Sequence, residues 1–149
     1  MDKAKGEVLV EGAERLEGGD FDLSNTPDLL PVLSVLALKA KSPVTITGVA
    51  HARTKETDRV ANIAKELVKF DARVEELHDG LKITAPRLIR NASLEAYNDH
   101  RLFMAFTIAS LITEKSMVAG AESADVSYPN FVADMKQLGA KITSAPDRE

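Results

Sequence analysis

The hydrophobic positions of the chain change period several times, from the alternation of a strand to the wider spacing of a helix. A helix predicted at residues 27–40 has apolar residues on nearly every side, so we expect it to be largely buried. Asp79-Gly80 favours a type I′ turn between the two strands that flank it. The predicted elements of this first part are, in order, strands at 8–10 and 21–23, the helix at 27–40, a strand at 44–49, an amphipathic helix at 55–70, and hairpin strands at 73–77 and 81–84.

The second part of the chain repeats this order of elements. A strongly apolar helix is predicted at 99–112, a strand at 116–119 and a helix at 129–138. The letters repeat as well, because Asp28 to Gly48 aligns with Asp99 to Gly120. A second alignment pairs Leu67 to Val74 with Met135 to Ile142.

The period of this repeat is about seventy residues, which is longer than the period of solenoid repeats. We therefore interpret the chain as two copies of a βαβαββ unit, at about 19–86 and 87–144, with the closing hairpin of the second copy missing. The predicted fold class is α/β, or α+β, with residues 1–149 forming a single, incomplete domain.

Composition narrows the possible partners. The chain has 149 residues, of which 44% are hydrophobic and 28% charged, so it falls in the globular range. Its formal charge of −4 argues against general affinity for nucleic acid, and no apolar run is long enough for a membrane span. Cysteine is absent and the first residues do not resemble a signal peptide. We expect a cytoplasmic protein without nucleic-acid or membrane partners.

Charged clusters stand at the starts of three predicted helices. Because the connections from strands to helices share one edge of an α/β sheet, where ligands usually bind, these clusters are expected to converge. The clusters are Asn25-Thr26-Pro27-Asp28, Arg53-Thr54-Lys55-Glu56-Thr57-Asp58-Arg59 and Asn98-Asp99-His100-Arg101.

Asp28 admits two interpretations. An acidic residue in the first turn offsets the helix dipole, and Pro27 is a normal first helical residue. Alternatively, a carboxylate at the edge of a site acts as a general base toward a ligand hydroxyl. The pattern by itself favours the first role and leaves the second open.

Lys55 and Arg59 place two cations four positions apart at the predicted start of a helix. Both the spacing and the helix N-terminus make these charges unfavourable, so a compensating negative charge is expected. Glu56 and Asp58 provide it in a solvated set of salt bridges, or an anionic ligand held by both cations provides it. Lys55 and Glu56, which are adjacent and of opposite charge, are also a candidate pair for proton transfer.

His100 and Arg101 begin a helix that is otherwise almost entirely apolar. Singly, such residues usually make local hydrogen bonds or lie on the surface. Together they are a candidate clamp for phosphate or carboxylate, which guanidinium groups bind through two parallel hydrogen bonds. His51 precedes the basic cluster and is a candidate for the same site, whereas His78, beside the hairpin turn, is expected to be exposed.

Several catalytic signatures are absent from the sequence. It contains no nucleophile elbow, Walker loop, glycine-rich dinucleotide fingerprint or metal-ligand spacing of His and Cys. We therefore expect neither a metal nor a cofactor. The residues alone predict an α/β chain with an anion-binding edge.

The chain resembles the C-terminal part of the EPSP synthase (3-phosphoshikimate 1-carboxyvinyltransferase) family from about residue 7 to 142. Lys-Glu-Thr-Asp-Arg, followed about forty residues later by Asp-His-Arg, is specific to this family. The related UDP-N-acetylglucosamine enolpyruvyl transferases are expected to share the fold without these two motifs. The motifs that carry the resemblance, in the family's order, are TPDLLPVLSVLA, HARTKETDR, NDHRLFMAF and VSYPNF.

The resemblance implies a two-domain enzyme in which repeated βαβαββ units form an inside-out barrel. It also implies transfer of the enolpyruvyl group of phosphoenolpyruvate to the 5-hydroxyl of shikimate 3-phosphate, with release of phosphate and without metal. By the resemblance, Asp28 would accept the hydroxyl proton, and Lys55 with Glu56 would transfer protons at the phosphoenolpyruvate methylene. The intact enzyme is expected to be a monomer. It is expected to act in the shikimate pathway, which leads to aromatic amino acids.

The same resemblance assigns binding roles. Arg59 and Arg101 would hold phosphoenolpyruvate, and His100 would support that site by hydrogen bonding. His51 stands where the family contacts the phosphate of shikimate 3-phosphate. One position departs from the pattern, because Val126 stands where many members have a phosphate-binding Lys.

The family's N-terminal domain is missing from the resemblance, so the chain by itself is expected to be catalytically inactive. Two other functions stay open at this point. A non-catalytic α/β binding module predicts that Lys55, Arg59 and Arg101 point apart. An enolpyruvyl transferase for a nucleotide sugar is disfavoured by the two specific motifs.

Overall fold

A computed structural model describes residues 9, 11–12 and 16–143. The strand predicted at 8–10 lies outside these residues, apart from Leu9. The elements are β1 (Gly19–Asp22), η1 (Pro27–Leu29), α1 (Leu30–Leu36), η2 (Ala37–Lys39), β2 (Val44–Thr47), η3 (Ala50–Thr54), α2 (Arg59–Leu67), η4 (Val68–Phe70), β3 (Arg73–Leu77), β4 (Gly80–Thr84), β5 (Ser93–Glu95), α3 (His100–Ser110), β6 (Met117–Ala119), η5 (Ala121–Val126) and α4 (Phe131–Gln137), where η denotes a short 3-10 helix.

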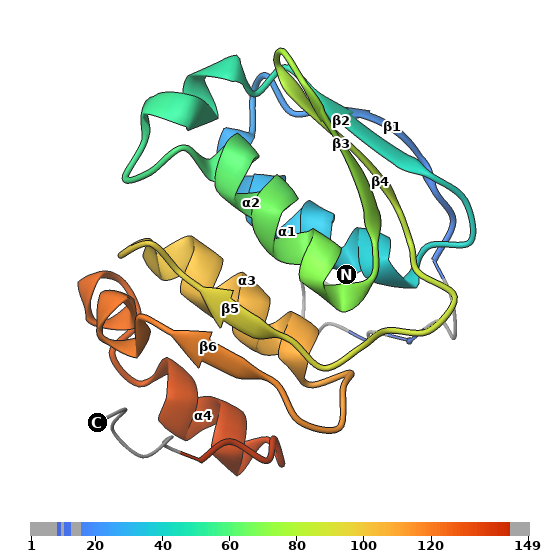
Figure 1. Ribbon diagram of the computed structural model, residues 1–149. Helices are drawn as coiled ribbons and strands as arrows, with labels where there is room; N and C mark the ends of the chain where they lie inside the picture. Colours follow the sequence, from blue (N-terminus) through green and yellow to red (C-terminus); the bar gives the residue numbers. More distant parts are fainter. Residues whose placement is uncertain (1–8, 10, 13–15, 144–149) are drawn as a thin grey trace.

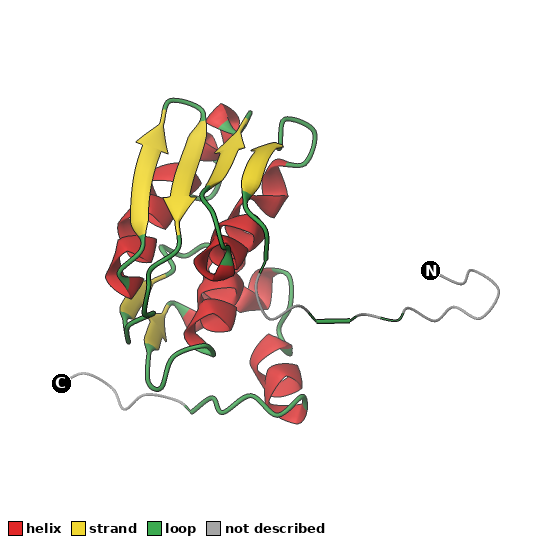
Figure 2. Cartoon of the chain, turned by 90° about the vertical axis from the view of Figure 1, so that its right-hand side faces the viewer, coloured by secondary structure: helices red, strands yellow, loops and turns green. Residues whose placement is uncertain are grey.

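A four-stranded sheet forms the first layer, with the strand order β1-β2-β4-β3. β1 and β2 are parallel, whereas β4 is antiparallel to both β2 and β3. Val44, Ile46, Leu81 and Ile83 are buried, whereas the residues that follow each of them, Thr45, Thr47, Lys82 and Thr84, are exposed or half-buried. This alternation gives the sheet one apolar face, which α1 and α2 cover (Figures 1 and 2).

Helix α3 lies between this layer and a second, smaller one. Its side chains Leu102 and Phe106 belong to the main core with α1, α2 and the sheet, whereas Phe103 belongs to a smaller cluster with Phe131 of α4. The parallel strands β5 and β6 and helix α4 pack on this second side (Figure 1). Because α3 has apolar side chains on nearly every side, it is buried against both layers, as its sequence predicts.

The same order of elements occurs in both parts of the chain. In each part a parallel strand pair is followed by a left-handed glycine, Gly48 with φ of 77° and Gly120 with φ of 89°. A 3-10 helix and then an α-helix come next. The aligned positions after α2 and α4 also share a positive φ, which is 72° at Asp71 and 99° at Gly139. Turns that need the same backbone conformation thus recur at corresponding places.

The prediction of a largely buried helix at 27–40 is only partly right. The segment forms η1, α1 and η2, and Leu30, Val35 and Leu38 are buried. Leu29 at the end of η1 and Val32 and Leu36 of α1 are 49%, 50% and 46% exposed, because they lie on the side of the segment turned away from the core. None of the helices in the described residues is long and apolar enough to cross a membrane.

The hairpin of β3 and β4 is confirmed, but its predicted turn is wrong. Leu77 pairs with Gly80, so the two loop residues are His78 and Asp79 rather than Asp79 and Gly80. None of these three loop-end residues His78, Asp79 and Gly80 has the positive φ that a type I′ turn requires. Gly80 has a different reason to be glycine, since a Cβ there would lie 1.8 Å from the carbonyl oxygen of Ile46.

Candidate active site

The starts of three helices converge on the carboxylate of Asp28. Asp28 lies in η1, Arg59 is the first residue of α2, and Arg101 is the second residue of α3. Arg59 Nη1 donates to Asp28 Oδ1 at 3.0 Å, and Arg101 Nη2 lies 3.0 Å from Asp28 Oδ2. Sequence reasoning left the role of Asp28 open, and the structure pairs it with two guanidinium groups.

Arg59 is the centre of this cluster. Its side chain is 1% exposed and donates to three carboxylates, those of Asp28, Glu56 and Asp99. Burial lowers the pKa of Arg59, but the hydrogen bonds and charge of Asp99, with the charges of Glu56 and Asp28, outweigh it and raise the pKa above its ordinary value. The guanidinium is therefore a fixed positive charge at the base of the site.

Asp99 is the residue that sequence reasoning missed as a partner of Arg59. It is 0% exposed, and it accepts from Arg59 Nε at 2.7 Å and Arg59 Nη2 at 3.3 Å. Its Oδ1 also accepts from the backbone N–H groups of Arg101 and Leu102, which makes it the N-cap of α3. An Asp before an apolar helix indicates a cap, but no signal in the sequence shows its distant partner.

The turn before Asp99 has an unusual backbone. Tyr97 and Asn98 both adopt positive φ, of 54° and 55°, which is uncommon for residues other than glycine. The hydroxyl of Tyr97 donates to the buried carboxylate of Glu66 at 2.7 Å, and the N–H of Glu95 donates to the same side chain. Burial and the bond to Glu66 raise the pKa of Tyr97. This network anchors the turn to α2.

The predicted start of the helix at residue 55 is wrong. Helix α2 begins at Arg59, because Asp58 is its N-cap and accepts from the N–H of Ala61. Lys55 therefore lies exposed in the preceding loop, and within the described part of the chain it forms no hydrogen bond or ion pair with Glu56. Glu56 bonds Arg59 Nη2 at 2.8 Å instead.

The histidines are distributed differently. His100 is the first residue of α3, between Asp99 and Arg101 in the sequence, and it is 8% exposed. His51 is exposed on η3, which packs against η1, the element that carries Asp28. His78 is exposed, as predicted. Val126, at the position of the family's Lys, is 76% exposed on η5.

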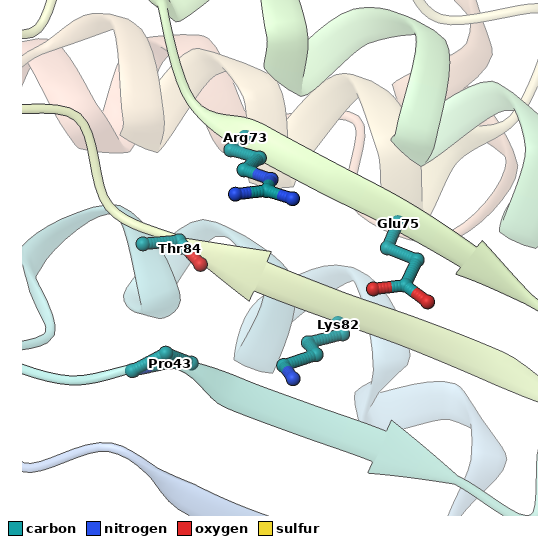
Figure 3. Close-up of a pocket in the computed structure, with 5 residues that line it drawn as sticks. All are labelled: Pro43, Arg73, Glu75, Lys82 and Thr84. Atoms are coloured by element: carbon teal, nitrogen blue, oxygen red, sulfur yellow. The ribbon is translucent and has the colours of Figure 1, made fainter.

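Two hollows on the surface share no residue with the cluster. One, of about 330 Å³, lies on the outer face of the sheet, where Arg73, Glu75 and Lys82 project away from the helices (Figure 3). The other, of about 1130 Å³, lies between α3, β6 and the segment after α4. Within the described residues, no group of three or more His, Asp or Glu side chains is arranged to hold a metal ion.

Comparison with known proteins gives consistent matches. The profile of EPSP synthase (3-phosphoshikimate 1-carboxyvinyltransferase) matches residues 1–146. A 3-phosphoshikimate 1-carboxyvinyltransferase from Nitrosopumilus maritimus is 48% identical over 136 residues, which are 91% of this chain and 32% of that protein. One from Methanocaldococcus jannaschii is 44% identical over 139 residues, 93% of this chain and 32% of that protein.

Solved structures agree on the fold. EPSP synthase from Acinetobacter baumannii superposes with a TM-score of 0.77 at 25% identity, over 85% of this chain and 31% of that one. The enolpyruvyl transferase NikO from Streptomyces tendae gives a TM-score of 0.69 at 21% identity, over 89% and 31% of the two chains, which shows a shared fold alone. The chain spans about a third of the length of the curated relatives it matches.

Proposed function

We propose that this chain, which belongs to the EPSP synthase family, carries part of an active site. The reaction at that site transfers the enolpyruvyl group of phosphoenolpyruvate to shikimate 3-phosphate. The 5-hydroxyl of shikimate 3-phosphate adds to C2 of phosphoenolpyruvate while C3 gains a proton. Loss of a proton from C3 and of phosphate from C2 then gives the enol ether and inorganic phosphate. The part of the family's fold that lies outside the matched third supplies the rest of the site.

The single observation that carries this proposal is the meeting of Arg59 and Arg101 at Asp28. Phosphoenolpyruvate has a carboxylate and a phosphate, and two oriented guanidinium groups stabilise both without reorganisation. When these groups of the substrate take the place of Asp28 on the arginines, the Asp28 carboxylate is released. It is then free to accept the proton of the attacking hydroxyl.

The remaining roles are proposed on the same basis. Glu56 bonds Arg59 and so lies at the edge of the cluster, from which it and Lys55 would exchange protons with C3. Lys55 is in the loop before α2, and substrate would have to draw it toward the cluster. His100 would support phosphoenolpyruvate, and His51 would contact the phosphate of shikimate 3-phosphate.

The rival functions differ in what they predict. A binding module predicts that the cations point apart, which describes Lys55 but not Arg59 and Arg101. A transferase for a nucleotide sugar would use the same fold with another acceptor. The cytoplasmic setting, the monomeric state and the absence of nucleic-acid partners stay predictions.

The test is phosphate release by the full-length enzyme with phosphoenolpyruvate plus either shikimate 3-phosphate or UDP-N-acetylglucosamine. Asp28→Asn and Arg101→Ala are each expected to lower the rate about 10²-fold or more, since they remove the base or an oriented cation. Arg73→Ala, on the outer face of the sheet, is the matched control and should leave the rate unchanged. Residues 1–149 alone should release no phosphate.

Each outcome decides between the functions. Release with shikimate 3-phosphate that depends on Asp28 and Arg101 supports the proposal. Release only with the nucleotide sugar would refute the proposed substrate, and release with neither would refute the proposed activity.

A further inference from the structure

Asp99 does not belong to the set of residues assigned to substrate binding or proton transfer, yet it joins two parts of the site. It is 0% exposed, and its two oxygens bond groups that lie on different helices. Resting on the proposed function, we propose that Asp99 is a positioning residue that fixes Arg59 and the start of α3, with Arg101, in one geometry for binding the anionic substrate.

The hydrogen bonds of Arg59 separate permanent from exchangeable partners. Asp99 takes the Nε side of the guanidinium, through Nε at 2.7 Å and Nη2 at 3.3 Å, and is shielded from water. Asp28 and Glu56 take the remaining N–H groups and are 48% and 42% exposed. A substrate anion arriving from solvent can replace the two exposed carboxylates, whereas it cannot reach the position of Asp99.

The same carboxylate sets the direction of α3. Asp99 Oδ1 accepts from Arg101 N at 2.9 Å and from Leu102 N at 3.3 Å, while Oδ2 accepts from Arg59 Nε. One side chain therefore ties the first residue of α2 to the first turn of α3. The backbone turn at Tyr97 and Asn98 positions Asp99 between the two helix starts, and the hydrogen bond from the Tyr97 hydroxyl to Glu66 fixes this turn. Rotation of either helix start would separate the two cations.

A purely structural N-cap is the alternative, and the substitution Asp99→Asn distinguishes it. The amide keeps an oxygen that can accept from the N–H groups of α3, so the cap is retained. It replaces the second oxygen by an NH₂ group, which has no lone pair for Arg59 Nε–H. If Asp99 acts only as an N-cap, the Asn variant should keep both its thermal stability and its KM, whereas a positioning role predicts a raised KM.

In the full-length enzyme we expect Asp99→Asn to raise the KM for phosphoenolpyruvate by about 10²-fold, the effect of misplacing a binding group by about 1 Å. Asp58→Asn is the matched control, because Asp58 caps α2 but does not bond the Arg59 guanidinium. Its KM should stay within about twofold of the unchanged enzyme. In an Arg59→Met background, Asp99→Asn should have little further effect, since both act through one interaction.

A second measurement does not depend on the reaction. The Nε–H of Arg59, buried against Asp99, should give a slowly exchanging signal in ¹⁵N NMR that disappears in Asp99→Asn and persists in Asp58→Asn. If the unchanged enzyme releases no phosphate, the proposed function fails while this signal still reports on Arg59. An unchanged KM in a folded Asp99→Asn enzyme, or additive effects with Arg59→Met, would overturn the positioning role.

Discussion

Removal of the Arg59 guanidinium tests how the buried cluster contributes to stability. Arg59→Met keeps most of the apolar stem and removes the charge, leaving Asp99 buried with only the two N–H donors of α3. Breaking a buried pair from one side costs about 3–5 kcal/mol, because an unpaired charge stays inside the protein. The bonds to Asp28 and Glu56, which are half exposed, add only about 0–1 kcal/mol each.

Urea unfolding followed by circular dichroism measures this free energy. With a slope of about 1–3 kcal/mol per molar urea, a loss of 3 kcal/mol lowers the midpoint by about 1–3 M. Arg90→Met is the matched control, since Arg90 and Asp71 form a pair that is 69% and 57% exposed. It should change the free energy of unfolding by less than about 1 kcal/mol.

A second variant distinguishes the cost in stability of the unpaired Asp99 charge from the cost of the packing lost at residue 59. In the Arg59→Met background, Asp99→Asn removes the unpaired charge and keeps the cap, so it should recover much of the lost stability. If Arg59→Met lowers the free energy of unfolding no more than Arg90→Met does, the buried Arg59–Asp99 pair stabilises the fold no more than an exposed pair. Further destabilisation by Asp99→Asn in that background would likewise show that the uncompensated charge is not the cause.

Two other predictions concern the surroundings of the site and the sheet. Because the pKa of Tyr97 is raised in the folded state, its stabilising effect is complete below its ordinary pKa of about 10 and is lost as the pH rises above it. The melting temperature of Tyr97→Phe should therefore fall less with pH above 10 than that of the unchanged protein. If thermal melts show the same fall in both proteins, the Tyr97–Glu66 bond does not have this role. Gly80→Ala should destabilise by about 1–3 kcal/mol, because its Cβ would lie 1.8 Å from the Ile46 oxygen. Gly12→Ala, with nothing within 4 Å, is the control, and equal urea midpoints for the two variants would refute the close approach.

The elements of this chain follow closely from local patterns. Within the described residues each strand and α-helix except β5 was predicted at about its observed place, as were the hairpin, the exposed His78 and the buried character of α3. Predictions that depend on details at the ends of elements were less accurate. Helix α2 begins at Arg59 rather than near 55, since Asp58 is the residue whose carboxylate caps it. The hairpin loop shifted by one residue, because Gly80 is needed for close packing against β2.

The sequence by itself determined that charged residues stand at three helix starts, and it predicted that these starts converge. Only the tertiary structure decided which charges meet, because that depends on the packing of α1, α2 and α3 around a common core. Packing brings Arg59 and Arg101 to Asp28 and leaves Lys55 in solvent. It also buries Asp99 against Arg59, forty positions away in the chain, where a local pattern shows only a helix cap.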